Sequence, residues 1–167
     1  MPVEGILLAA GESRRMGFPK PLLRLGNQTF VALLSQAMLE AVARLTVVIG
    51  AHADRVRPAV PADPQIRVVV NQQWPQGQLS SLKAGLRQLG PDCDAVVVHL
   101  IDHPTVSAAT FRALVASRGI PGRSIVVARR GARRGHPVIF ERNVFEELLA
   151  TPEDLGARVV VDADRSR

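Results

Sequence analysis

The chain has 167 residues, which suits a single domain, and 47% of them are hydrophobic, enough to build a buried core. A formal net charge of +6 favours an anionic partner, but with no Tyr, one Trp and five Phe few side chains could stack on bases, so we expect no nucleic-acid partner. Cys93 is the only cysteine and no apolar run approaches the ~20 residues that cross a bilayer, so we expect a cytoplasmic protein without a membrane partner.

Short apolar runs alternate with amphipathic stretches along the chain. The pattern predicts strands over 3–9, 46–49, 66–70, 95–101 and 124–128, and helices over 29–44, 79–89 and 108–117. The strands are nearly continuous runs of Val, Ile and Leu, which is typical of parallel strands covered by helices on both faces. We therefore expect an α/β fold: a doubly wound, mostly parallel, Rossmann-like sheet in three α/β/α layers, with ligands beyond the carboxyl ends of the strands.

The pattern changes after residue 128. Four arginines surround Gly131 within residues 129–134, and we interpret this segment as a basic turn. Residues 138–140 are predicted as a short strand that returns to the sheet, and 143–150 as a helix that Asn143 could cap. Residues 156–164 fit either a helix or a strand.

The loop after the first predicted strand, Leu8 to Lys20, combines small residues with positive charge. Ala10 and Gly11 allow another group to approach the backbone, and exposed N–H groups in such a turn can bind phosphate oxygens. Three cations follow, with only Glu12 to balance them: Arg14, Arg15 and Lys20. Because they repel one another without an anionic ligand, a triphosphate site is favoured; the alternative is an ordinary βα turn with a solvated basic face.

The spacing excludes two common phosphate-binding motifs. Walker A requires Lys-Ser/Thr straight after its second glycine, but Phe18 follows Gly17, and the dinucleotide fingerprint requires a further glycine between Gly11 and Gly17. Residues 8–20, L-A-A-G-E-S-R-R-M-G-F-P-K, instead resemble the signature L-A-A-G-x-S-x-R-M-G-x-P-K of the molybdenum cofactor nucleotidyltransferase family. The closest resemblance is to the cytidylyltransferase branch, and it extends from Val3 to about Gly156.

The resemblance implies roles for the loop residues. Backbone groups of the first four would hold the nucleotide: Leu8, Ala9, Ala10 and Gly11. Arg15 would bind the triphosphate and Lys20 would neutralise charge around the α-phosphate, whereas Arg14 falls at a variable position and is expected at the surface.

A second polar segment, residues 71–82, follows the third predicted strand. Pro75 and Gly77 mark a turn, and a serine could cap the next helix, so a capped loop is one interpretation. The segment is also similar to a family element, N-x-x-W-x-x-G-x-x-x-S-L. That similarity implies that four residues line the base and ribose pocket: Asn71, Gly77, Ser80 and Ser81.

Asp102 ends the fourth predicted strand, where its carboxylate would face the ligand crevice. Mg²⁺ prefers oxygen ligands and takes one or two protein carboxylates together with phosphates, so Asp102 is a candidate magnesium ligand. A helix cap or turn residue is the alternative. The family has a metal-binding Asp in a similar D-x-P element, and the resemblance therefore implies the metal role.

Gly135-His136-Pro137 is similar to a G-H-P element that the family has near its second substrate. The resemblance implies that His136 contacts an acceptor phosphate, whereas its chemistry alone fits an ordinary surface histidine. The arginines of 129–134 fit either a solvated run or the docking of an anionic pterin. His52, after the second predicted strand, is a candidate contact to the base.

Together these motifs predict a nucleotidyltransferase in which a substrate phosphate attacks the α-phosphate of a triphosphate and pyrophosphate leaves. The resemblance implies CTP as donor, molybdopterin carrying molybdenum as acceptor and Mg²⁺ as cofactor. Three alternatives stay open: GTP as donor, a sugar or alcohol phosphate as acceptor, and a non-catalytic nucleotide-binding module.

One element of the family pattern is missing. Family members continue into a strand and a helix with a D-x-D-T-P-E-D-like element that carries another metal-binding acid, whereas Thr151-Pro152-Glu153-Asp154 comes too early to be this element. We therefore interpret residues 1–167 as one nucleotidyltransferase domain that lacks the usual C-terminal strand and helix.

Overall fold

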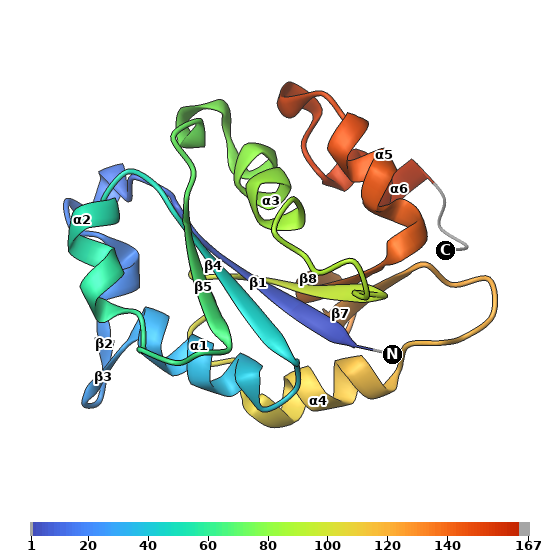
Figure 1. Cartoon of the computed structure of the whole chain (residues 1–167), viewed down its shortest axis with the longest axis horizontal. Coiled ribbons are helices and arrows are strands. Elements are labelled where there is room, and N and C mark those ends of the chain that lie inside the picture. The colour runs from blue at the N-terminus through green and yellow to red at the C-terminus, as the bar shows by residue number, and fades with distance from the viewer. Residues whose placement is uncertain (1, 164–167) are drawn as a thin grey trace.

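The architecture was analysed in a computed structural model, which describes residues 2–163. A six-stranded sheet runs through the middle in the order β5-β4-β1-β6-β8-β7 (Figure 1). Its strands are β1 (Val3–Ala9), β4 (Arg44–Ile49), β5 (Ile66–Val70), β6 (Ala95–Leu100), β7 (Ile125–Arg130) and β8 (Arg133–Glu141). The first four strands are parallel, while β8 is antiparallel to both β6 and β7, so the predicted doubly wound, mostly parallel sheet is confirmed.

Helices cover both faces of the sheet (Figure 1). On one face lie α1 (Phe30–Leu39) and α4 (Ala108–Ala116), whose Leu34 and Phe111 pack with Leu7 of β1. On the other face lie α3 (Gln78–Leu86), α5 (Phe145–Ala150) and α6 (Arg158–Ala163), whose apolar side chains pack with Ile6 and Leu8. Successive residues of a strand point to opposite faces, so a strand of Val, Ile and Leu supplies both cores, and the three-layer prediction is confirmed.

The predicted elements differ from the observed ones mainly at their ends. The helix predicted over 29–44 stops at Leu39, because the backbone N–H of Ala43 donates to the carbonyl of Val3 (2.8 Å) and the chain turns into β4. Thr29 caps this helix through its side chain, which accepts from the N–H of Ala32. The ambiguous C-terminal stretch forms the helix α6 as far as the structure describes it.

The segment interpreted as a basic turn is the end of a β-hairpin. Strands β7 and β8 pair up to Arg130 opposite Arg133, and Gly131, with φ of 59°, makes the reversal between them. The predicted strand over 138–140 is only the buried end of β8, because its first residues are exposed and polar and lack the apolar pattern of a core strand. The short elements α2 (Ala53–Val56), β2 (Arg24–Leu25) and β3 (Gln28–Thr29) were not predicted.

None of the helices within residues 2–163 is long and apolar enough to cross a membrane.

Three loops meet at Gly50, directly after β4. The N–H of Ala51 donates to the carbonyl of Ala10 (3.1 Å) in the loop after β1. A Cβ atom at Gly50 would lie 2.7 Å from this carbonyl oxygen and 2.9 Å from Cβ of Trp74 in the loop before α3. Only glycine fits between these backbones, so Gly50 brings the ends of β1, β4 and β5 together.

We expect Gly50→Ala to destabilise the protein by about 1–3 kcal/mol, because the new methyl group meets backbone that cannot rotate away. Urea unfolding measures this loss. Gly135→Ala is the matched control, since Gly135 has no atom within 4 Å of a Cβ position and no positive φ. Equal effects of the two substitutions would contradict the close approach at Gly50.

Candidate functional site

The chain passes from β1 to β4 and β5 on one side and then returns to β6 on the other side of β1. The carboxyl ends of β1 and β6 therefore diverge at a topological switch point, where α/β sheets bind ligands. A cavity of about 460 Å³ lies there. Its lining comes from three segments: Leu8, Ala10 to Arg14 and Lys20 after β1; Trp74, Pro75, Gly77, Gln78 and Ser81 around the start of α3; and Leu100 to Asp102 at the end of β6.

The loop after β1 turns sharply at Ser13. This residue has φ of 58°, a left-handed conformation that costs a non-glycine residue roughly 1–2 kcal/mol. Its hydroxyl oxygen accepts a hydrogen bond from the backbone N–H of Lys20 at 3.1 Å, across seven residues of loop. Ser13 thus closes the loop on itself and brings Lys20 back to the cavity.

Lys20 and Asp102 meet at the edge of this cavity. The Nζ atom lies 3.0 Å from both carboxylate oxygens, and the two side chains come from segments 82 residues apart. The side chains are 30% and 48% exposed, so the ion pair adds little to stability. The pair places a cation suited to phosphate beside a carboxylate suited to a metal ion.

The two arginines of the loop lie differently. Arg14 and Arg15 belong to one short turn of 3-10 helix, Arg14–Met16, and only Arg14 lines the cavity. Arg14 forms an ion pair with Glu12, whereas Arg15, the residue that the resemblance selected, is exposed and outside the lining. Arg14 lies at the surface as expected, with its side chain 81% exposed, although it also lines the cavity.

The side chain of His52 contacts the loop after β1 and does not line the cavity. Its Nε2 lies 2.9 Å from the carbonyl oxygen of Glu12. Since a carbonyl only accepts, Nε2 carries the hydrogen and donates it. His52 therefore fixes the backbone of the loop, and it is not among the residues that line the cavity.

The predicted residues of segment 71–82 divide into two groups. Gly77 and Ser81 line the cavity. Asn71, only 6% exposed, donates through Nδ2 to the hydroxyl oxygens of Ser80 (2.9 Å) and Ser81 (3.0 Å), and Ser80 lies 2.8 Å from the carbonyl of Gly77. Asn71 and Ser80 thus hold the loop from behind and are not lining residues, and neither is the buried Ala9.

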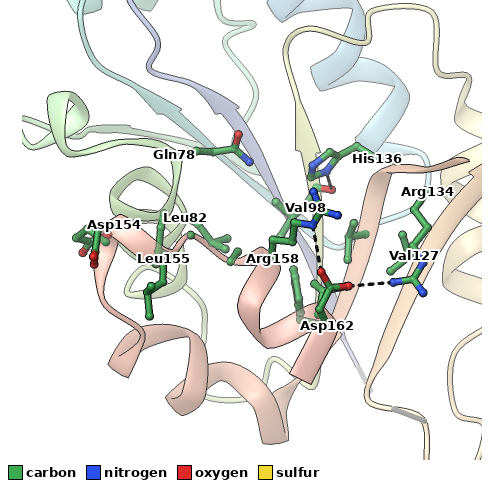
Figure 2. A pocket seen from close by; sticks show the side chains of 18 of the residues that line it. Gln78, Leu82, Val98, Val127, Arg134, His136, Asp154, Leu155, Arg158 and Asp162 are labelled. Atoms are coloured by element: carbon green, nitrogen blue, oxygen red, sulfur yellow. Dashed lines mark hydrogen bonds and ion pairs between the residues drawn. The ribbon is translucent and has the colours of Figure 1, made fainter. Parts of the chain in front are cut away.

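A second, larger cavity of about 740 Å³ is shown in Figure 2, and Gln78 lines both it and the first cavity. Its walls come from α3, β6, the β7–β8 hairpin and the segment 153–162, and they combine apolar side chains with charged ones such as Arg134 and Arg158. Asp162 bridges two arginines at its edge, with 3.2 Å to Arg134 and 3.1 Å to Arg158 (Figure 2). His136, the predicted acceptor contact, lines this cavity and not the smaller one.

Three histidine rings gather behind the end of β6. The ring centroids of His99, His103 and His136 lie 6.2–6.4 Å from one another. Burial lowers the pKa of His136, and it lowers the pKa of the fully buried His99 to about 4, so both are neutral at pH 7. The sequence spacing did not reveal this cluster, because β8 brings His136 to β6 only through antiparallel pairing of distant segments.

His99 makes one hydrogen bond. Its Nε2 lies 3.1 Å from the carbonyl oxygen of His103, so it donates to the turn that contains Asp102. Its Nδ1 is buried and finds no partner within residues 2–163. An unpaired buried acceptor of this kind costs about 1–3 kcal/mol.

Asp102 suits a metal ion that is also held by waters and substrate phosphates. Within residues 2–163, no group of three or more His, Cys, Asp or Glu side chains is arranged to hold a metal. Mg²⁺ usually keeps several waters and binds through one or two carboxylates plus substrate phosphates. A half-exposed Asp102 at the edge of a cavity of about 460 Å³ matches that mode, and not that of a closed structural site.

Comparisons with known proteins agree with this geometry. The sequence profile of the MobA-like NTP transferase domain matches residues 5–167. Nicotine blue oxidoreductase from Paenarthrobacter nicotinovorans is 34% identical to this chain, and the match covers 94% of this chain and 80% of that protein. Molybdenum cofactor guanylyltransferase from Cereibacter sphaeroides is 36% identical to this chain, and the match covers 99% of this chain and 82% of that protein.

A solved structure is similar over almost the whole chain. The crystal structure of Rv0371c from Mycobacterium tuberculosis H37Rv matches with a TM-score of 0.86 and 32% identity, over 99% of this chain and 84% of that chain. A second crystal structure of Rv0371c is a complex with manganese and matches with a TM-score of 0.80 and 30% identity, over the same 99% and 84%.

We expect the buried His99 to make the protein less stable in acid. The unfolded chain binds a proton at this histidine below its ordinary pKa of 6.5, whereas the folded chain binds it only near pH 4. Between these values the unfolded state holds more protons, so the free energy of unfolding falls as the pH falls. From pH 7.5 to pH 5 the loss at this one group is about 2 kcal/mol.

Urea unfolding at both pH values, with His99→Leu as the comparison, isolates this contribution, because the variant keeps every other titrating group. The parent should lose about 2 kcal/mol more than the variant. Equal losses in the two proteins would show that another group is responsible.

Proposed function

Because this chain belongs to the MobA-like NTP transferase family and is a nucleotidyltransferase, we propose that it moves a nucleoside monophosphate from CTP to the phosphate of a molybdopterin-type acceptor. The observation that carries the proposal is the meeting of Lys20 and Asp102, 3.0 Å apart, at the switch point of the sheet beside a nucleotide-sized cavity. This arrangement offers a cation to the α-phosphate and a carboxylate to a metal-bound triphosphate.

In the proposed reaction, an oxygen of the acceptor phosphate attacks the α-phosphorus of the triphosphate. The bond from this phosphorus to the bridging oxygen breaks, and pyrophosphate leaves with the bonding electrons. Lys20 stabilises the negative charge that develops on the α-phosphate, while the backbone of Ala10 and Gly11 lies close enough to hold phosphate oxygens. Mg²⁺ on Asp102 would supply further neutralisation of the phosphate oxygens.

The choice of CTP rests on the resemblance of residues 8–20 to the cytidylyltransferase branch of the family. GTP is the second candidate, and the 36% identical relative named molybdenum cofactor guanylyltransferase favours it. Gln78 and Ser81 lie on the cavity wall and supply the amide and hydroxyl groups with which a base or ribose could pair.

The acceptor belongs in the second cavity on this proposal. His136 lines its wall next to β6, and the shared Gln78 makes the two cavities neighbours (Figure 2). Its wall combines apolar residues such as Leu82 with the cations Arg134 and Arg158, and this combination suits an anionic ring system such as a pterin that carries a phosphate. A cytoplasmic location is part of the proposal and is supported by the single cysteine.

Pyrophosphate release tests the function. We expect release with Mg²⁺, a molybdopterin acceptor and CTP, and about 10²–10³-fold slower release by Lys20→Ala, because one charge-stabilising group is lost from the transition state. Arg112→Ala is the matched control, since Arg112 pairs with Glu40 on the α1 and α4 face away from the cavity.

The nucleotide screen separates the candidates. Release with GTP and not with CTP would replace the proposed donor by the second candidate. Binding of a triphosphate without release, with every acceptor offered, would instead favour the non-catalytic module. A Lys20→Ala variant as fast as the parent would remove Lys20 from the mechanism.

A second prediction concerns the two arginines of the loop. We expect Arg15→Ala to weaken triphosphate binding about tenfold, as loss of one charged hydrogen bond does, and Arg14→Ala to weaken it less than about twofold. Glu12 already compensates the charge of Arg14, and the resemblance selects Arg15. Isothermal titration with the Mg²⁺ complex of CTP measures both; the reverse ranking would favour Arg14, which lines the cavity.

A further inference from the structure

His99 occupies a position where an apolar side chain would serve the fold better. It lies in β6, in the run Ala-Val-Val-Val-His-Leu, and is 0% exposed. Its ring packs edge-on against Phe111 of α4, with 5.0 Å between ring centroids. One of its two nitrogens has no partner within residues 2–163. Folding gains nothing from this unpaired nitrogen, so the use of histidine here calls for another explanation.

The single hydrogen bond of His99 supplies that explanation. Nε2 donates to the carbonyl of His103 at 3.1 Å, and the N–H of His103 donates in turn to the carbonyl of Leu100 at 3.3 Å. These two bonds close a turn with Asp102 inside it. Asp102 and His103 are exposed, so side-chain packing holds them weakly, and the buried imidazole anchors the turn from below.

We propose that His99 is a positioning residue for Asp102. By holding the carbonyl of His103, it keeps the Asp102 carboxylate at the cavity edge, facing Lys20. The neutral state of the buried ring suits this task, because the hydrogen bond to the carbonyl of His103 requires a hydrogen on Nε2 only. What Asp102 binds there, a metal-bound triphosphate, rests on the proposed function; the anchoring itself does not.

Two other roles for His99 conflict with the geometry. A general base must reach a proton in the cavity, but His99 is buried and does not line either cavity. A metal ligand needs a nitrogen directed at the ion together with other ligands, but Nε2 of His99 is engaged with the carbonyl of His103, and the unpaired Nδ1 is buried on a residue that lines neither cavity. Its neighbours His103 and His136 do not form a metal-binding group with it within residues 2–163.

The test compares His99→Leu with His99→Gln. Leucine fills a similar volume and removes the donor, whereas the amide nitrogen of glutamine reaches about as far along the side chain as Nε2 and restores a donor. Hydrogen exchange of the backbone amides of Ile101, His103 and Val106, which donate to backbone carbonyls in and beside the turn, reports on the turn directly, without any ligand. Isothermal titration with the Mg²⁺ complexes of CTP and GTP reports on Asp102, with Asp102→Asn as the reference, and urea unfolding at pH 7.5 reports on overall stability.

For His99→Leu, we expect amide exchange at Ile101, His103 and Val106 to accelerate about tenfold or more and triphosphate affinity to fall about tenfold, toward that of Asp102→Asn, because small misplacements of a binding group are costly. The urea midpoint should be unchanged or higher, since the unpaired nitrogen is gone. For His99→Gln, exchange and affinity should return to within about threefold of the parent.

Several results would overturn the proposal. Parent-like exchange at the turn in His99→Leu would show that His99 does not anchor it. Equally fast exchange in His99→Gln would show that the donor is not the anchor. A His99→Leu protein that unfolds more easily at pH 7.5 would indicate a purely structural histidine. If the parent binds no triphosphate at all, the proposed function fails, while the exchange measurement still decides the role of His99.

Discussion

The parallel pairing of β1 with β4 on one side and β6 on the other sets the geometry of everything else in this protein. All seven residues of β1 are buried, and its register brings Ala9 opposite Ile49 and Leu8 opposite Leu100. The carboxyl ends of the three strands are therefore level. Each strand must end in a loop on the same edge of the sheet, and because the chain reverses its winding direction between β1 and β6, those loops separate and leave a cavity between them.

The residues that line this cavity are not the residues that hold it in shape. Ser13 holds the backbone of Lys20, His52 holds the carbonyl of Glu12, and Asn71 holds two serines at the start of α3. Each contact pairs polar groups of the loops that are wholly or partly buried. His99 makes the same kind of contact beneath the turn that contains Asp102. It differs from these three residues because one of its own side-chain nitrogens has no partner within residues 2–163.

The difference between residues that line the cavity and residues that support it explains which parts of the structure the sequence predicted. The strands 3–9 and 66–70 were predicted at their observed bounds, because short apolar runs of this length favour strands over helices. Lys20, Gly77, Ser81 and Asp102 were correctly expected near one another, because strand order alone places their loops together. Periodicity could not predict which of Arg14 and Arg15 lines the cavity, since both belong to one short turn of 3-10 helix that no apolar pattern orients. It also could not predict that Asn71 and Ser80 lie behind the cavity wall. The sequence pattern of a capped loop is the same whether its polar side chains face the cavity or the protein interior.

The ion pair of Lys20 and Asp102 follows from the same geometry and bears on how the site works. Two half-exposed side chains in contact stabilise a protein by at most about 1 kcal/mol, so little free energy opposes their separation. On the proposed function, a metal-bound triphosphate would bring a phosphate for the lysine and a cation for the carboxylate, and it would replace one weak interaction by two stronger ones. The pair therefore keeps both charges at the cavity edge without opposing the ligand. Since neither charge is held by burial, the alignment of Asp102 depends on the turn that carries it and on the hydrogen bond that fixes that turn.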